Sequence, residues 1–191
     1  MKKILLTVVA VMLPMLMMAQ ALKPAIGINV TNVSEDPDTG EMQGQVAWQV
    51  GASFLIGKKF YVEPGVFYVK KSTKYVSSGT SPEEFNSDLT GVRIPVSVGL
   101  SLLGNEESLI GLRVFGGGSM FIITSVDTPD LVKEDFNSPS WGVFAGAGVD
   151  IWILFVDLKY EWSLTDVTSV TDFNVGQFRS FYANAGVRIR F

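Results

Sequence analysis

The sequence predicts an all-β fold: a single eight-stranded antiparallel up-and-down transmembrane β-barrel. Three observations predict it. Apolar residues alternate with polar or small residues along most of the chain, short and long connections alternate between these segments, and no long apolar run follows the first twenty or so positions. The chain is 47% hydrophobic and only 18% charged, with 19 glycines and 13 phenylalanines. This composition favours strands and tight packing, and it is apolar for a soluble exported domain.

Residues 1–21 are predicted to be a signal peptide, and residues 22–191 to form the barrel. Met1-Lys2-Lys3 is a basic start, the run from Ile4 to Met18 is apolar, and Ala19-Gln20-Ala21 offers a small-residue cleavage site. A proline interrupts the apolar run, whereas a spanning helix would need roughly 18 or more apolar residues. The sequence therefore favours export with a cleaved signal over an uncleaved anchor.

Eight segments are predicted to be strands because two kinds of residue alternate in each, which is the period of a strand with two different faces. In the fourth segment, for example, Val92, Ile94 and Val96 alternate with Gly91 and Arg93. Bulky branched or aromatic residues make up one face of every segment. These apolar faces include Ile26, Val46, Phe60, Val92, Ile110, Trp141, Leu154 and Phe181, one from each segment.

The connections between the segments alternate in length. Those after the second, fourth and sixth segments are only a few residues long. The others, near 34–44, 72–90, 125–140 and 166–176, are roughly 10–20 residues long, which is unusual inside a compact soluble domain. Short periplasmic turns and longer extracellular loops are typical of outer-membrane barrels.

The apolar face is predicted to point outward into lipid. The interior of a small barrel is narrow, so the bulky residues of eight strands would not fit inside it. Facing water, they would expose an apolar surface on the order of hundreds of Å². A soluble periplasmic ligand-binding barrel with these residues in its core is the alternative. Six aromatic residues near strand ends are expected at the membrane interfaces: Trp48, Tyr68, Trp141, Tyr160, Trp162 and Phe191.

Ten charged residues are predicted to point into the lumen. Buried charges persist mainly when they are paired and hydrogen-bonded, so we expect a salt-bridge network that plugs the barrel. A narrow pore for ions or small solutes is the alternative interpretation. The ten residues are Glu63, Lys71, Arg93, Arg113, Asp150, Asp157, Lys159, Glu161, Arg188 and Arg190.

Charge and missing residue types exclude several functions. The formal net charge is −4, and removal of Lys2 and Lys3 lowers it to −6, so no nucleic-acid partner is expected. The chain has no histidine and no cysteine, which removes the usual nucleophilic triads and the usual zinc ligands. Asp157 and Glu161 would lie roughly 13 Å apart on one strand, too far for paired acid–base work. We expect no catalytic residue, cofactor or metal site.

Acidic residues gather in two long connections, where they could bind calcium or bridge through it to lipopolysaccharide. They show no regular ligand spacing, so solvated acidic loops are the favoured interpretation. These residues are Glu35, Asp36, Asp38, Glu41, Asp127, Asp130, Glu134 and Asp135.

Several stretches resemble the outer-membrane β-barrel domain proteins of Bacteroidetes, described as PorT-like or OmpX-type small barrels. These stretches are 18–20, 61–71, 146–150 with 156–162, and 186–191. The resemblance implies an outer-membrane location. It also implies that the C-terminal strand ending in Phe191, with Ile189 and Val187 on the same face, is the signal read by the barrel-assembly machinery. PorT-like proteins are associated with protein secretion.

Together these observations predict a non-enzymatic barrel with a structural, adhesive or partner-binding role in the cell envelope. The expected partners are outer-membrane lipid and lipopolysaccharide, the barrel-assembly machinery, and an envelope protein bound through the extracellular loops.

Overall fold

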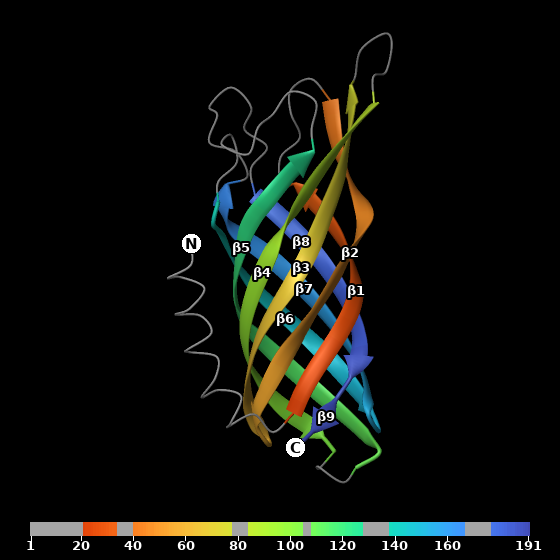
Figure 1. The fold of residues 1–191 in the computed structure, drawn as a ribbon, viewed down its shortest axis with the longest axis vertical. Coiled ribbons are helices and arrows are strands. Elements are labelled where there is room, and N and C mark those ends of the chain that lie inside the picture. The colour runs from red at the N-terminus through yellow and green to blue at the C-terminus, as the bar shows by residue number, and fades with distance from the viewer. Residues whose placement is uncertain (1–20, 34–39, 78–83, 105–107, 128–137, 167–176) are drawn as a thin grey trace.

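A computed structural model describes residues 21–33, 40–77, 84–104, 108–127, 138–166 and 177–191, which form one closed antiparallel sheet (Figure 1). From β1 to β8, each strand pairs with its neighbours in the chain, and β1 also pairs with β8, which closes the barrel. The strands are β1 (Ala21–Val33), β2 (Gly40–Gly57), β3 (Phe60–Ser77), β4 (Glu84–Leu103), β5 (Ile110–Asp127), β6 (Ser140–Ile151), β7 (Leu154–Asp166), β8 (Gln177–Val187) and β9 (Ile189–Arg190). The predicted eight-stranded up-and-down barrel is confirmed. Within the described ranges, no helix has the length and hydropathy needed to cross a membrane.

The predicted eighth strand is split in two. β8 ends at Val187, and β9 then continues along β1, where Ile189 pairs with Leu22 and Arg190 with Ala21. Between them, the Arg188 N–H donates to the Ile153 carbonyl oxygen at 2.6 Å. One backbone bond to the β6–β7 turn therefore interrupts the last strand, and the C-terminus lies beside the start of β1.

Strands β2 to β5 extend further than the sequence pattern predicted. The segment 72–90 was predicted to be a loop, but much of it is strand, with β3–β4 pairs from Ser72–Asp88 to Val76–Glu84. Above the last β1–β2 pair, Val30–Val46, β2 pairs only with β3 among the described residues. These segments lack the apolar alternation of the other strands, so the sequence carries no strand signal there.

We call this extension the projecting sheet: residues 40–45 of β2, 72–77 of β3, 84–88 of β4 and 122–127 of β5. It rises above the other strands at the loop end of the barrel (Figure 1). Its outer strands have no ladder partner on one side within the described residues, since β5 pairs with β6 only up to Phe121. Each outer edge carries one described side-chain bond: the Gly44 N–H donates to Asn32 Oδ1 at 2.9 Å, and the Ile123 N–H donates to Ser138 Oγ at 3.1 Å. Beyond these bonds, the two edges have no ladder partner among the described residues.

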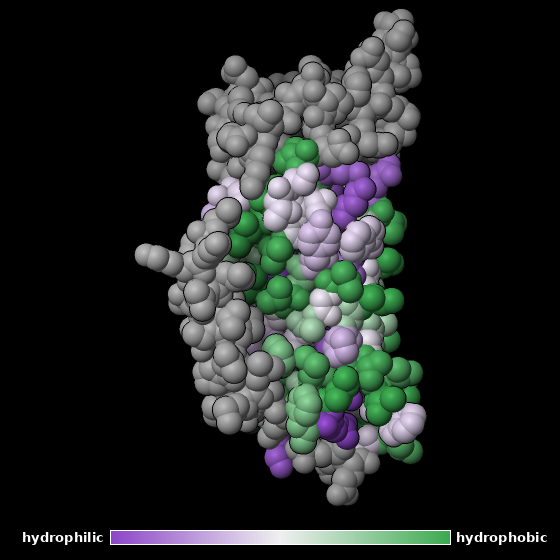
Figure 2. Space-filling view, in the orientation of Figure 1, coloured by the Kyte–Doolittle hydropathy of each residue, from purple (hydrophilic) through white to green (hydrophobic). Residues whose placement is uncertain are grey.

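The outer surface of the barrel carries the apolar faces. On β4, Val98 is 63% exposed, whereas the neighbouring Ser97 is 5% exposed and points inward. The same alternation runs along β6, where Val143, Ala145 and Ala147 are exposed. Figure 2 shows hydrophobic side chains over the middle of the visible face and hydrophilic ones nearer its ends. The predicted assignment of the two faces matches the structure.

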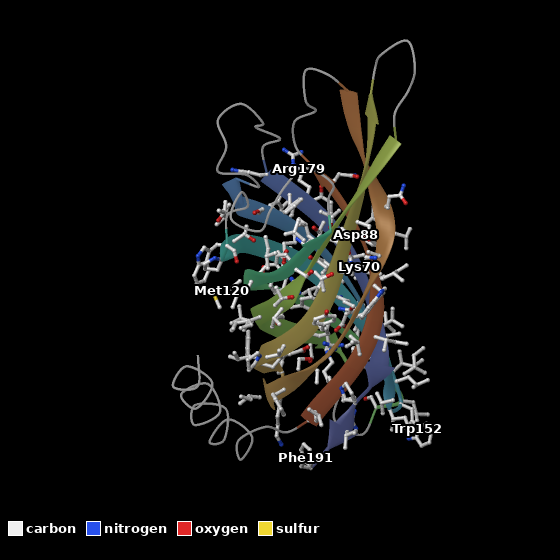
Figure 3. All side chains as sticks on the ribbon, turned by 45° about the horizontal axis from the view of Figure 1, so that its top comes forward. Lys70, Asp88, Met120, Trp152, Arg179 and Phe191 are labelled. Atoms are coloured by element: carbon white, nitrogen blue, oxygen red, sulfur yellow. The ribbon has the colours of Figure 1, made fainter. Side chains whose placement is uncertain are left out.

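Exposed aromatic residues occur near both ends of the apolar surface. Trp162 and Trp141 lie near the loop end, and Trp152 lies in the β6–β7 turn, toward the opposite end (Figure 3). Trp152 and Trp162 are ten positions apart, so at a rise of roughly 3.3 Å per residue and a tilt of roughly 40° they are separated by about 25 Å along the barrel axis. This is the height of the apolar band of a membrane barrel.

The position of the β6–β7 turn explains its unusual apolar sequence. Ile151, Trp152, Ile153 and Leu154 are all exposed, at the level where the apolar surface ends. Trp152 has a φ of 55°, and its N–H donates to the carbonyl oxygen of Leu109 in the neighbouring turn at 2.7 Å. A bulky residue rarely adopts this conformation, which here leaves the indole on the outside as an interfacial anchor.

Inside the barrel, aromatic side chains fill the space and glycines make room for them. One apolar cluster contains Phe67, Phe121, Phe155, Phe178 and Tyr182, and a second contains Ala21, Leu55, Tyr61, Phe115 and Phe144. The ring of Tyr61 lies against Gly99, where an added Cβ atom would stand 2.2 Å from the ring carbon Cζ. Gly99 is therefore required by the close approach of the tyrosine.

We expect the Gly99→Ala substitution to lower the free energy of unfolding by about 1–3 kcal/mol, because the new methyl group overlaps the Tyr61 ring. The measurement is urea unfolding in detergent micelles, followed by heat-modifiable migration on gels. Gly118→Ala on β5 is the matched control, since its added methyl group would meet only the Gly142 carbonyl oxygen, at 3.7 Å. Equal stability of the two variants would contradict the packing of Tyr61 on Gly99.

Candidate functional site: the lumen

The lumen gathers buried charged side chains from six strands. Strand alternation places them on the inner face, and the closed sheet brings residues far apart in sequence to the same level. Eight of the ten predicted residues are buried, with the Asp150 side chain 8% exposed, and the Arg188 side chain is 15% exposed at its end of the barrel. Arg190 lies at the open turn end and is exposed.

The largest group of ion pairs centres on Arg113. Its guanidinium donates to Asp150 through Nε at 2.8 Å and to Asp157 through Nη2 at 2.8 Å, and its Nη1 lies 3.6 Å from Glu63. Lys23 connects two of the same carboxylates, at 3.0 Å from Glu63 and 3.1 Å from Asp157. Each carboxylate in this group faces at least two cations, which is how buried charges are held without water.

Lys23 is missing from the set predicted from the sequence. It is fully buried, and its position on the same face as Ala25, Gly27 and Asn29 would have identified it. Lys23 lies at the start of the first predicted strand, so the alternation did not assign its side chain to either face.

A second ion pair lies nearer the loop end. Arg93 binds Glu161 with both Nε, at 2.8 Å, and Nη2. Ser119 donates to the same carboxylate at 2.7 Å, and the Tyr182 hydroxyl donates to its other oxygen at 3.4 Å. The guanidinium also lies 4.5 Å from the centre of the Tyr182 ring. This forked pair is therefore enclosed by polar and aromatic contacts.

Lys71 and Lys159 were predicted to join the ion pairs, but the structure places them on aromatic rings. Lys71 Nζ lies 4.8 Å from the ring centre of Phe121 and 4.7 Å from that of Phe178. Lys159 Nζ lies within 6 Å of three phenylalanine rings. Among residues whose side chains are described, no carboxylate forms an ion pair with either lysine. Desolvated ammonium groups are stabilised by such cation–π contacts.

Several aromatic residues on the inner face were also not predicted individually. Their signal is the same alternation, since each stands at an inward position of its strand. The inward aromatic residues that were missed are Tyr61, Phe67, Phe115, Phe121, Phe144, Phe155 and Phe178.

At the turn end, Arg188 joins the charged group. Its Nη1 donates to Asp150 at 3.2 Å, so Asp150 connects Arg188 to Arg113. Of the predicted assembly-signal residues, Val187 pairs with Leu154, Ile189 is exposed, and Phe191 is the C-terminal residue, 80% exposed. All three lie around the turn end of the barrel.

No metal site is found among the described residues, where no group of three or more acidic side chains is placed to hold an ion. Of the acidic loop residues weighed as calcium ligands, Glu35, Asp36, Asp38, Asp130, Glu134 and Asp135 lie outside the described ranges. Glu41 and Asp127 are at strand ends, on β2 and β5.

A closed barrel with an apolar outer belt and a charged, filled interior corresponds to a known protein family. Residues 19–169 match the family described as outer membrane protein beta-barrel domain. The chain belongs to this family. Its short turns therefore face the periplasm and its loop end faces outward, and the protein is located in the outer membrane. The alternative of a soluble periplasmic barrel is wrong.

Solved outer-membrane barrels have the same fold. The chain is similar to the outer membrane protein OprG of Pseudomonas aeruginosa, with 11% identity, 91% of this chain and 96% of that chain covered, and a TM-score of 0.54. It is also similar to Ail, the attachment invasion locus protein of Yersinia pestis, in complex with the heparin analogue sucrose octasulfate, with 14% identity, coverage of 90% and 100%, and a TM-score of 0.50. No curated protein matches the sequence.

Proposed function

We propose that the protein is a non-enzymatic, non-conducting membrane anchor that presents its extracellular end for a structural or adhesive role. The observation that carries this proposal is the filled lumen. Arg93, Arg113, Lys23 and Tyr182 are each at most 1% exposed and occupy the middle of the barrel. The protein would then act through contacts at the ends of the barrel and not by transport through its lumen.

Two layers of contacts support a closed lumen. The ion pairs around Arg113 and Arg93 cross it, and the buried cluster that contains Phe67, Phe121 and Phe178 packs inside the same barrel. Ions would have to separate buried pairs whose charges have little other solvation. The narrow-pore alternative would require this packing to open, so we favour a plug.

The projecting sheet supports a presenting role. Beyond the bonds of Gly44 and Ile123, its two outer edges have no ladder partner among the described residues. Such edges can pair with an extended segment of another protein, a common mode of recognition. Ail, whose name refers to attachment, has a barrel of the same kind. Because the loops of this chain are acidic, a protein partner is a better match than a sulfated glycan.

We further propose that the protein is related to the PorT-like and OmpX-type small barrels of Bacteroidetes. We also propose that residues 1–21 are its signal peptide. Val187, Ile189 and Phe191 would be read by the barrel-assembly machinery. The pairing of β9 with β1 at the closing seam is consistent with that role, because the C-terminal strand must be positioned for closure.

The test removes the projecting part of β3 and β4. Residues 73–87 are replaced by Asn-Gly, which joins Ser72 to Asp88, two residues already paired and hydrogen-bonded at 2.6 Å. We expect the barrel to assemble and cells expressing the variant to lose attachment to protein-coated surfaces. A matched variant with Trp152→Phe at the periplasmic end should attach normally. Full attachment by the shortened protein would overturn the presenting role.

A further inference from the structure

The periplasmic mouth of the barrel contains a cavity of about 820 Å³, which we call the periplasmic vestibule. This volume is within the range of small-molecule binding sites. Its wall includes Lys58 and Lys59 from the β2–β3 turn, Asp150 from β6, and Arg188, Arg190 and Phe191 from the end of the chain. Of the lumen charges described above, only Asp150, Arg188 and Arg190 line this space.

The vestibule ends blindly inside the barrel. Toward the lumen, Asp150 is held by Arg113 at 2.8 Å, and Arg113 in turn holds Asp157. The cluster of Ala21, Leu55, Tyr61, Phe115 and Phe144 provides apolar packing among the same inner walls. A solute entering from the periplasm would therefore be retained at the mouth rather than passed through.

The described charges of the vestibule are mainly positive. Four cations face the single carboxylate of Asp150 and the chain terminus, and Asp150 is already bound by two arginines. The Arg188 guanidinium is positioned in advance, because Nη1 donates to Asp150 at 3.2 Å and the backbone N–H is fixed by Ile153 at 2.6 Å. Its Nε is buried and has no hydrogen-bond partner among the described residues, so the Nε–Hε signal reports any change in how this guanidinium is held.

We propose that the periplasmic vestibule binds a phosphate group. A planar guanidinium matches phosphate oxygens with two parallel donors, and lysines add charge without demanding one geometry. Leu102, Leu103 and Phe191 give the mouth an apolar rim, so the phosphate is expected to carry an organic part. Two sources have this chemistry: a soluble phosphorylated compound of the periplasm, or the headgroup of a phospholipid in the adjoining leaflet.

The experiment follows the Arg188 Nε–Hε signal by NMR. The full mature barrel, in maltoside micelles that contain no phosphate, is titrated with glycerol 3-phosphate, and saturable movement of this signal is expected. Lys58→Gln with Lys59→Gln should weaken the affinity by about tenfold, because two charges near the anion are lost while only exposed turn side chains change. Arg179→Gln is the matched control, since this exposed cation lies at the opposite end (Figure 3).

A second arm separates the two sources. In phospholipid nanodiscs, a lipid-borne phosphate would give the shifted Arg188 signal without any titrant, whereas a soluble ligand would leave the unshifted signal and allow titration. Both arms are repeated in a variant that carries Glu106→Gln and Glu107→Gln, two acidic turn residues outside the described ranges. In this variant too, replacing Lys58 and Lys59 by glutamine should weaken the phosphate affinity by about tenfold. An Arg188 signal that moves in neither arm, or an affinity unchanged by loss of both lysines, would overturn the proposal. Attachment through the projecting sheet would be unaffected by that result.

Discussion

Replacing Arg93 by methionine should lower the free energy of unfolding of the barrel by about 3–5 kcal/mol, the cost of leaving a buried charge without its partner. Arg93 and Glu161 lie in the middle of the lumen, fully buried and about 6% exposed respectively. Without the guanidinium, the described hydrogen-bond partners of Glu161 are the hydroxyl groups of Ser119 and Tyr182, and Lys71 is the nearby cation that remains. The measurement is urea unfolding and refolding in lipid vesicles, followed by tryptophan fluorescence.

The double variant Arg93→Met with Glu161→Leu distinguishes an unpaired charge from a simple loss of packing. Two apolar side chains of similar volume remove the charge and its partner together, so most of the lost stability should return. If the double variant is as unstable as the single one, the cost comes from packing against Phe144 and Tyr182 instead.

Replacing Val96 by arginine should lower the free energy of unfolding by about 2–4 kcal/mol in a bilayer, because a charge would then face lipid near the membrane centre. Val96 is 47% exposed on the outer surface, and it stands seven positions from both Leu89 and Leu103 along β4. The measurement is again unfolding in vesicles, compared with the wild-type protein.

The matched control is Leu164→Arg, also on the outer surface but next to the extracellular end of β7, where the cost should fall to about 0–1 kcal/mol. Equal costs at the two positions would mean that depth in the membrane does not matter. No cost at Val96 would show that this face does not meet lipid.

The sequence was most informative where one face of a strand meets lipid. From Val92 to Leu102, every second residue is bulky and apolar, so both the strand and its outward face could be predicted. At 72–77 and 84–88 the strands continue without that alternation, so the sequence predicted a loop there. The alternation of apolar and polar residues shows that the two faces of a strand meet different environments. A strand without this difference has no alternation and cannot be predicted from it.

The sequence predicted which residues face the lumen better than it predicted which of them form ion pairs. Alternation assigns Glu63, Arg113 and Asp157 to the interior, but strand register decides that they meet. Lys71 and Lys159 show the limit most clearly. Their partners are rings from other strands, and nothing in local sequence says that a charge will lie on an aromatic ring rather than beside a carboxylate.

The most direct test of the closed lumen is single-channel recording from the purified protein in planar bilayers. The packed interior predicts no conductance steps under an applied voltage. Arg113→Ala with Asp157→Ala, which removes the centre of the ion-pair group, should give small steps through the space left behind. Steady, reproducible steps from the wild-type protein would contradict the plug and favour a narrow pore.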